Sequence, residues 1–261
     1  MSEALRPNLG VMFDLIPTLT DKEWLKQEGP SLKLNVTDTG IFEITGLLQF
    51  DMMYDAESNK YTISPNENSN QGVRIRDNYE IRILFQRGNV SHLPKVYEVG
   101  SRLLSLAKEK KIPPIDLHVS ADGSVCLCIV EREKEYFPEG FRLQTFIDDL
   151  VIPFFYAQTY YKERNEWPWG EYSHGILGIF EWYGENKNAT EKTVNQTIDR
   201  LRSSAGWPSL QQLLRRKDNI KGNMDCFCQA KTKIRSCHPV AFSGLWKLKK
   251  DLYTFSILIN K

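Results

Sequence analysis

Long apolar runs are missing from the amino-acid sequence. Its longest apolar stretches, such as GILGIF and FSILI, are far shorter than the roughly 20 residues that a helix needs to cross a bilayer. The first 19 residues carry acidic side chains and lack the basic segment, apolar run and small-residue cleavage site of a secretory signal. We therefore expect no transmembrane helix and a cytoplasmic protein, in which thiols stay reduced.

An excess of charge of one sign is also missing. The 261 residues hold 34 Lys and Arg against 33 Asp and Glu, a formal net charge of +1. No overall field would draw such a chain to nucleic acid or to a membrane, and we expect neither as a partner. What the sequence does have is 41% hydrophobic and 11% aromatic residues, enough for a sizeable core, so we expect a globular protein.

The first hundred residues predict an antiparallel sheet. Between residues 78 and 88, Tyr79, Ile81 and Ile83 alternate with polar side chains, which is the pattern of a strand with one buried face. Other segments are rich in β-branched and aromatic residues and are bounded by glycine, proline or polar turns. The predicted strands lie at 40–55, 59–65, 78–88 and 93–100, and the short loops between them favour a four-strand meander.

Helical patterns precede and follow these strands. A short helix is expected within residues 11–30, and another at 101–111 with Ser101 as its N-cap. Apolar residues at helical spacing predict a third helix at 141–164, which Pro153 should kink or interrupt. Strands with flanking helices place the chain in the α+β class.

The C-terminal part is predicted to be helical. Two helices are expected at 188–203 and 208–218, and the 20-residue tail at 242–261 is expected to end in a short strand or helix. We therefore expect one domain at 1–185 and a helical extension at 186–261.

Four residues of metal-ligating types lie close together near the C-terminus. Cys226 and Cys228 form a C-x-C pair, and Cys237 and His238 follow after eight residues. Thiolate and imidazole ligands in two close pairs can surround one tetrahedral zinc ion at about 2.0 to 2.3 Å. Because the protein would fill all four positions, the zinc would be structural. The alternative is that three buried or free cysteines lie beside an incidental histidine.

This pattern resembles the SEC-C zinc motif, whose usual form is C-x-C, eight residues and then C-C or C-H. The resemblance covers about thirteen residues, and the glycine and serine usual after the second cysteine are missing. It implies a zinc-binding appendage that binds partners and does not catalyse. Three basic residues inside the interval would form a small positive surface for a partner protein or nucleic acid: Lys231, Lys233 and Arg235.

A second C-x-C pair, Cys126 and Cys128, lies a hundred residues earlier. The Asp-Gly turn in SADGSV places Cys126 at the end of a tight turn, where its thiol would be accessible. An accessible thiol can act as a nucleophile through its thiolate. The alternative is an ordinary half-buried strand cysteine, and Cys128 is expected to be a core or neighbouring thiol.

Residues 10–165 resemble the ubiquitin-conjugating enzymes. The likeness rests on the order of an N-terminal helix, a four-strand meander, a histidine and the sequence GSVCL, which matches the family's G-x-I-C-L with Cys126 as nucleophile. His118 stands for the histidine of the family's H-P-N motif, but Val119 and Ser120 replace its Pro and Asn. The histidine also lies eight residues before the cysteine, where the family has about ten. Such departures are typical of divergent bacterial relatives found in anti-phage operons.

This resemblance implies thioester chemistry. Cys126 would take the C-terminal carbonyl of a ubiquitin-like protein, or of another target protein, from an activating enzyme and pass it to an amine. His174 would approach Cys126 as a base or hydrogen-bond donor, unless it is a structural histidine in an aromatic-rich strand and turn. Asp148 and Asp149 would orient an incoming lysine, or form a solvated helix face. The rival function is a non-catalytic adaptor of the same fold, which binds partners through its sheet and zinc tail.

Overall fold

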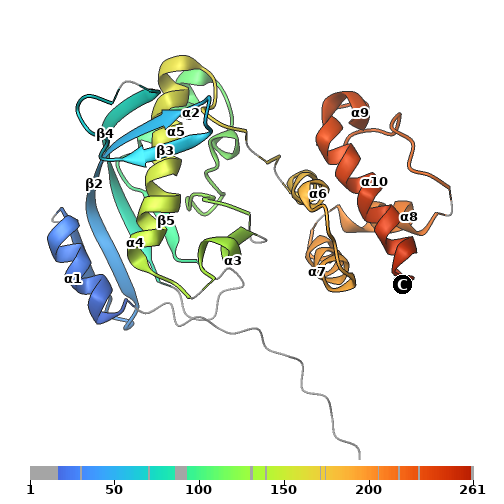
Figure 1. Cartoon of the computed structure of the whole chain (residues 1–261), viewed down its shortest axis with the longest axis horizontal. Coiled ribbons are helices and arrows are strands. Elements are labelled where there is room, and N and C mark those ends of the chain that lie inside the picture. The colour runs from blue at the N-terminus through green and yellow to red at the C-terminus, as the bar shows by residue number, and fades with distance from the viewer. Residues whose placement is uncertain are drawn as a thin grey trace, which may run out of the picture. The chain divides into compact units, whose positions relative to one another are not determined.

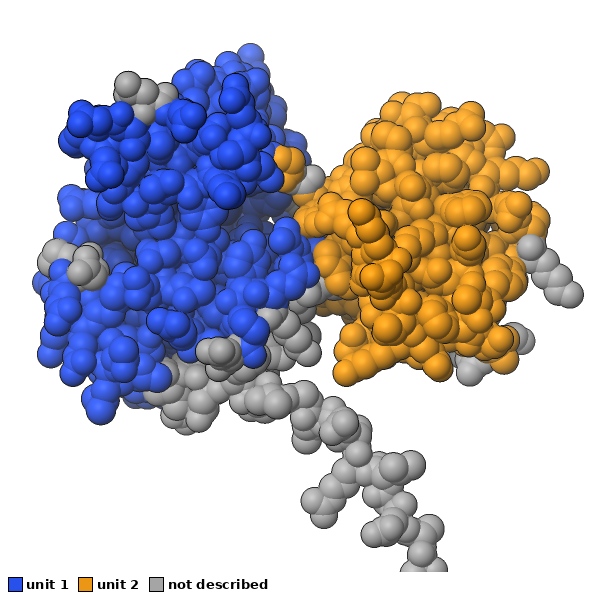
Figure 2. Space-filling model, viewed as in Figure 1, with its two compact units in different colours: residues 1–169 blue, residues 170–261 orange. Residues whose placement is uncertain are grey.

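The chain divides between residues 169 and 170 into two units, each with a hydrophobic core of its own (Figure 2). The computed structural model describes residues 17–259, except 30, 70, 86–92, 130–131, 139, 171, 174, 205, 217 and 229. Within this described part, no helix is both long and apolar enough to cross a membrane.

Unit 1 is built on one antiparallel sheet, which confirms the α+β class. The sheet has the order β1-β2-β4-β5, with β3 paired to β2. Since β4 covers residues 43–54 of β2, the strands β1 and β3 share the opposite edge of β2. The strand bounds are Leu32–Val36 (β1), Phe42–Asp55 (β2), Lys60–Ile63 (β3), Val73–Leu84 (β4) and Lys95–Glu98 (β5).

The strand order departs from the simple meander that the sequence predicts. The predicted third strand, here β4, pairs with β2 and not with the predicted second strand, here β3. The physical reason is length, because β3 has four residues and the 14-residue β2 offers β4 twelve partners. A further strand, β1, lies outside the four predicted segments.

The longest helix of unit 1, α5, lies across one face of this sheet (Figure 1). It packs against β4, where the ring of Phe155 stacks on Tyr79 with ring centroids 4.4 Å apart. The hydroxyls of Tyr79 and Thr159 are hydrogen-bonded at 2.9 Å. The bounds are Leu19–Glu28 (α1), Arg102–Lys110 (α2), Pro114–Leu117 (η1), Glu133–Tyr136 (α3), Leu143–Phe146 (α4), Ile147–Val151 (η3) and Ile152–Arg164 (α5).

Two local predictions about these helices have different outcomes. Pro153 does interrupt the helical segment, because the chain passes through the π-helical turn η3 just before it, and the amide of Ile152 donates to the carbonyl of Ile147. Ser101 is the N-cap residue of α2, as predicted, but its hydroxyl caps no amide of the helix. Glu98 does this instead, and its Oε2 accepts from the amide of Leu103 at 3.1 Å.

Unit 2 is helical and begins earlier than the predicted boundary at 185/186. Its first helix, α6, packs along α10, and Phe180 and Tyr183 are fully buried in the core of this unit. The two helices cross at a pair of glycines, where a Cβ on Gly184 would lie 3.2 Å from the Cα of Gly244. A Cβ on Gly244 would collide with the carbonyl oxygen of Phe180. The helices are Ile176–Glu185 (α6), Glu191–Arg202 (α7), Trp207–Arg215 (α8), Ile234–Cys237 (α9) and Pro239–Thr254 (α10).

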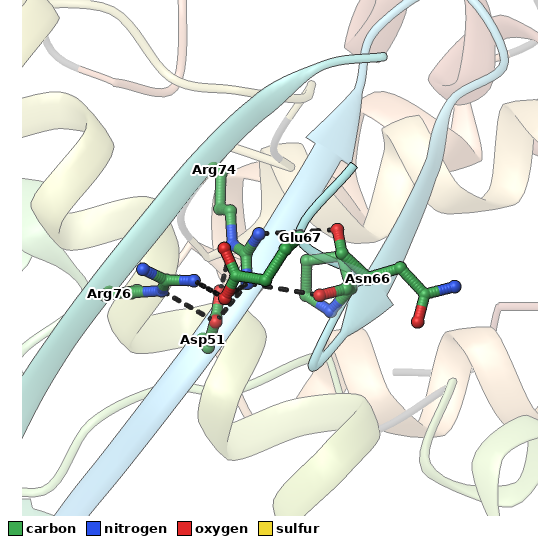
Figure 3. Close-up of polar contacts among 6 residues, drawn as sticks. Asp51, Asn66, Glu67, Arg74 and Arg76 are labelled. Carbon is green, nitrogen blue, oxygen red and sulfur yellow. Dashed lines mark hydrogen bonds and ion pairs between the residues drawn. The ribbon is translucent and has the colours of Figure 1, made fainter. Parts of the chain in front are cut away.

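An ion-pair network holds the loop between β3 and β4 against the sheet (Figure 3). Asp51 on β2 accepts from Arg74 at 2.6 and 2.7 Å and from Arg76 at 2.8 Å. Arg74 also donates to the carbonyl of Pro65 at 3.1 Å, and Glu67 pairs with both arginines. The hydrogen bond from Arg74, with a second from Arg76, lowers the pKa of Asp51 to about 2.

Replacing Asp51 with asparagine is therefore expected to lower the free energy of unfolding at pH 7 by about 1 kcal/mol. Because the native pKa is lowered, this contribution is complete above the unfolded pKa, near 4, and is lost as the pH falls towards about 2. Urea unfolding at several pH values would measure it. The exposed Asp38→Asn variant is the matched control, and an equal loss in both variants would contradict this role.

Candidate functional site

The segment from His118 to Cys126 forms a short hairpin beside the sheet. Val119 and Val125 form an antiparallel bridge, and the amide of Cys126 donates to the carbonyl of His118 at 2.8 Å. At the tip, Gly123 adopts a φ of +81°, a conformation that favours glycine. The hairpin therefore brings the predicted nucleophile opposite the backbone of the predicted histidine.

This hairpin is attached to the edge strand β5. The amide of Val125 donates to the carbonyl of Val96 at 2.8 Å, and Ser124 forms a bridge with Tyr97. Both Val119 and Val125 are buried in the core of unit 1. The hairpin thus extends the sheet by a short piece of strand that ends at Cys126.

Asp122 fixes the turn of the hairpin. Its carboxylate accepts from the amide and hydroxyl of Ser124, at 3.1 and 2.6 Å, and from Nζ of Lys95 on β5 at 2.6 Å. The Lys95 hydrogen bond, followed by those from Ser124, lowers the pKa of Asp122 to about 2. The sequence argument used the Asp-Gly pair only as a turn signal and missed this attachment to the sheet.

Replacing Asp122 with alanine is expected to loosen the hairpin. Three hydrogen bonds to a carboxylate are lost, so amide exchange in residues 118–126 should accelerate about fivefold or more, which corresponds to at least about 1 kcal/mol. Hydrogen exchange followed by mass spectrometry would measure it. The control is Asp116→Ala on neighbouring η1, whose side chain is exposed; unchanged exchange in Asp122→Ala would contradict the role of this carboxylate.

The two cysteines of this segment differ in accessibility. The Cys126 side chain is exposed, and its thiol donates to the carbonyl of Cys128 at 3.7 Å. Burial, together with the nearby carboxylate of Glu133, raises the pKa of Cys128 to about 12. Cys128 is therefore protonated at neutral pH and packs against the core, whereas Cys126 presents its sulfur to solvent.

His118 has a left-handed backbone and a packed ring. Its φ is +56°, and the imidazole meets the ring of Trp167 edge to face with ring centroids 6.0 Å apart. Trp167 in turn stacks on Tyr161 of α5 at 4.5 Å. The buried amide of Gln158 donates to the carbonyl of Leu117 at 3.2 Å and so holds the residue before His118. The sequence contained no signal for this support from α5.

The other predicted catalytic residues have different positions. His174 lies outside the described residues, so its predicted role stays a prediction. Asp148 and Asp149 are half-buried on η3, and Asp149 accepts from the hydroxyl of Tyr61 at 3.1 Å. Burial raises the pKa of Tyr136 and both Cys128 and Asp149 add to the shift, so the phenol lies near both residues. Asp149 and Cys128 therefore both lie within electrostatic range of the Tyr136 phenol.

Unit 2 brings together the four predicted metal ligands. The Sγ of Cys226 lies 3.2 Å from Nδ1 of His238, and the Sγ atoms of Cys228 and Cys237 lie 3.5 Å apart. All four ligand atoms lie within 4.8 Å of one another. In a tetrahedral zinc site, with zinc–sulfur bonds of about 2.3 Å, sulfur atoms are about 3.8 Å apart. The cluster is therefore of the right size and donor set to bind a metal ion.

The local backbone explains why the two ligand pairs meet. Asp225 and Lys233 form an antiparallel bridge, and the amide of Cys226 donates to the carbonyl of Thr232 at 2.9 Å. This turn carries the chain back to α9, which ends at Cys237. His238 is the N-cap residue of α10.

Burial and hydrogen bonds distinguish two of the thiols. Burial raises the pKa of Cys226 to about 11, and the amide of Ala230 lowers the pKa of Cys228. A bound cation would favour the thiolate of every cysteine in the cluster.

Comparison with known proteins adds no family to these observations. The chain matches no family model, no curated protein and no solved structure. The hairpin with its exposed cysteine and the metal-ligand cluster are the two features of the described residues that suggest a function.

Proposed function

We propose that this chain is a ubiquitin-conjugating-like enzyme. Cys126 carries the C-terminal carbonyl of a ubiquitin-like protein, or of another target protein, as a thioester and passes it to an amine. An activating enzyme supplies the acyl group, and the process belongs to bacterial anti-phage defence. The observation that carries this proposal is the exposed thiol at the end of a hairpin anchored to a sheet edge, beside a second cysteine that is half-buried and protonated.

The chemistry needs an accessible nucleophile on a fixed backbone and little else. The Cys126 thiolate attacks the carbonyl carbon of the donor thioester, a new carbon–sulfur bond forms, and the donor thiolate leaves. An amine then attacks the same carbon, an amide bond forms, the Cys126 thiolate leaves and the amine releases a proton. Both acyl donor and acceptor are proteins, so the site has to be open, as the exposure of Cys126 allows.

One acidic side chain near this segment suits an amine acceptor. Asp149 is half-buried on η3 and lies within electrostatic range of Tyr136, as Cys128 does. A carboxylate attracts a lysine ammonium and can accept its proton as the amide forms. We assign the positioning of the acceptor to Asp149, whose carboxylate is held by Tyr61.

We further propose that the cluster in unit 2 is a structural zinc site of the SEC-C type. Three thiols and one imidazole form a donor set that suits zinc and leave no position for a water ligand. Metal analysis of the purified protein tests this assignment. About one equivalent of zinc is expected, and less than about half an equivalent would count against it.

A thioester probe tests the proposed acyl transfer without knowledge of the natural partner. The full chain would be incubated with a short peptide that carries a C-terminal mercaptoethanesulfonate thioester, and the products would be mapped by mass spectrometry. The expected product is a peptide thioester on Cys126 that is cleaved by hydroxylamine but not by a phosphine reductant, and that discharges to free lysine at least tenfold faster than the same thioester of glutathione. The enzyme proposal would be contradicted if adducts formed on several cysteines, or if the Cys126 thioester discharged no faster than the glutathione thioester.

The second candidate is the non-catalytic adaptor. The packing of His118 against Trp167 favours it, because a ring held in an aromatic contact can have a purely structural role. An adaptor would show neither selective acylation at Cys126 nor faster discharge, so the same measurement separates the two functions.

A further inference from the structure

The two units carry opposite charge. Residues 170–261 hold 15 Lys and Arg against 8 Asp and Glu, a formal charge of +7, whereas residues 1–169 hold 19 against 25, a formal charge of −6. The net charge of +1 for the whole chain is the sum of these two values. The expectation that nucleic acid is not a partner rested on that sum and does not apply to unit 2 taken alone.

Much of the positive charge of unit 2 lies in one segment around the metal-ligand cluster. Residues 215–235 contain seven Lys and Arg and two Asp. Six of these basic side chains are exposed in the structure, and one of them, Lys233, pairs with Asp225. The other five are Arg215, Arg216, Lys221, Lys231 and Arg235.

Both acidic residues of this segment lie close to lysines. Asp225 is paired with Lys233 at 2.7 Å. Burial lowers the pKa of Lys249 on α10, and the nearby carboxylate of Asp218 opposes that shift. The Asp218 carbonyl also accepts from Nζ of Lys249 at 2.7 Å. The excess positive charge therefore rests on the five exposed basic side chains other than Lys233.

Exposed aromatic residues on α10 continue this basic surface. Trp246, Lys250 and Tyr253 recur at helical spacing, and the two rings are 47% and 57% exposed. The ammonium of Lys250 lies 5.9 Å from the centroid of the Trp246 ring. The hydroxyl of Tyr253 donates to the carbonyl of Arg216 at 3.0 Å, which places this end of α10 beside the basic segment.

We propose that unit 2 binds single-stranded nucleic acid through residues 215–235 and the aromatic face of α10. The basic side chains neutralise phosphates, and the rings of Trp246 and Tyr253 stack on bases. An acidic polypeptide would satisfy the positive charge but would leave the two exposed rings unexplained. Unit 1, with its negative charge, would repel the same ligand, so we place the whole interface on unit 2.

Fluorescence anisotropy with the zinc-loaded full chain tests this proposal. The probe is a fluorescein-labelled 20-nucleotide single strand of mixed sequence, used as DNA and as RNA. Because five cations are available, the logarithm of the binding constant should fall with the logarithm of the salt concentration with a slope of about −3.5. The same DNA as a duplex should bind more weakly than the single strand.

Two double variants of equal charge separate a specific surface from a general charge effect. Arg216→Gln with Lys221→Gln should reduce the magnitude of the salt slope by about 1.4 and weaken binding about tenfold or more at 0.1 M salt. Lys187→Gln with Lys192→Gln removes two exposed lysines elsewhere in unit 2 and should change the binding constant less than about twofold. Trp246→Ala should weaken binding of the single strand about tenfold and that of the duplex much less.

Three results would overturn the proposal. They are the absence of binding at 50 mM salt, equal losses in the two double variants, and competition by polyglutamate as effective per charge as that by unlabelled oligonucleotide. The last would assign the surface to an acidic protein partner. Cys126→Ala should bind the oligonucleotide as the unaltered chain does, so this test and the test of acyl transfer can fail independently.

Discussion

Replacing Cys126 with alanine is expected to abolish acyl transfer from a peptide thioester, with a loss of about a thousandfold or more. The reason is that no other described thiol of unit 1 can replace it. Cys128 is largely buried, and its pKa of about 12 leaves almost no thiolate at neutral pH. The measurement is the initial rate of adduct formation, followed by intact-protein mass spectrometry.

Cys128→Ala is the matched control for this variant. It removes a thiol two residues away and should leave the rate within about threefold of that of the unaltered chain. The expected order would be reversed if Cys128 were the nucleophile, and then Cys128→Ala would be the inactive variant. Thermal unfolding of both variants shows whether either loss reflects the stability of unit 1.

Removing the metal is the second change with a large expected effect, and it should act on unit 2 alone. A structural zinc site contributes several kcal/mol to folding because its ligands assemble only in the folded chain. The ligands here connect the turn at Cys226 with the start of α10 at His238, so their release frees the N-terminal end of the longest helix of this unit. Treatment with a strong chelator should increase hydrogen exchange in residues 222–245 at least tenfold and leave β2 and β4 unchanged.

Cys237→Ser should reproduce the effect of the chelator, since a hydroxyl is a poor ligand for zinc. Cys126→Ser is the matched control, because it makes the same substitution outside the cluster and should change neither zinc content nor exchange in unit 2. Restoring zinc should reverse the effect of the chelator. If exchange in the chelated protein matched that of the untreated protein, the metal would have no structural role.

The sequence predicted well those features that depend on neighbouring residues. The alternation in residues 78–88 predicted an antiparallel strand, and the spacing of Cys226, Cys228, Cys237 and His238 predicted a cluster of metal-ligating groups. Each pattern is short in sequence, so local geometry brings its members together. The exposure of Cys126 followed in the same way from the turn that precedes it.

Features that depend on distant contacts could not be predicted. The aromatic-rich strand and turn predicted as the structural alternative around His174 is instead a helix at Ile176–Glu185. It forms α6 because Gly184 and Gly244 let two helices approach closely, a contact between residues 60 positions apart. Because α6 packs on α10, residues 170–185 belong to unit 2, and the boundary lies after residue 169 where the sequence predicted it after residue 185. The pairing of β4 with β2 in place of β3 likewise depends on contacts between residues far apart in the sequence.

Helix α10 approaches α6 most closely at Gly244, near the middle of α10. Gly244 lies six residues after His238, about 9 Å along the helix axis, so a bulky side chain at Gly244 would tilt the end of α10 that begins at the metal ligand His238. The C-terminal half of α10 carries Lys250 and Tyr253, which the same tilt would move in the opposite direction. The distance between α6 and α10 therefore determines the tilt of α10. This tilt fixes both the position of the metal ligand at its start and the orientation of the exposed aromatic residues near its end.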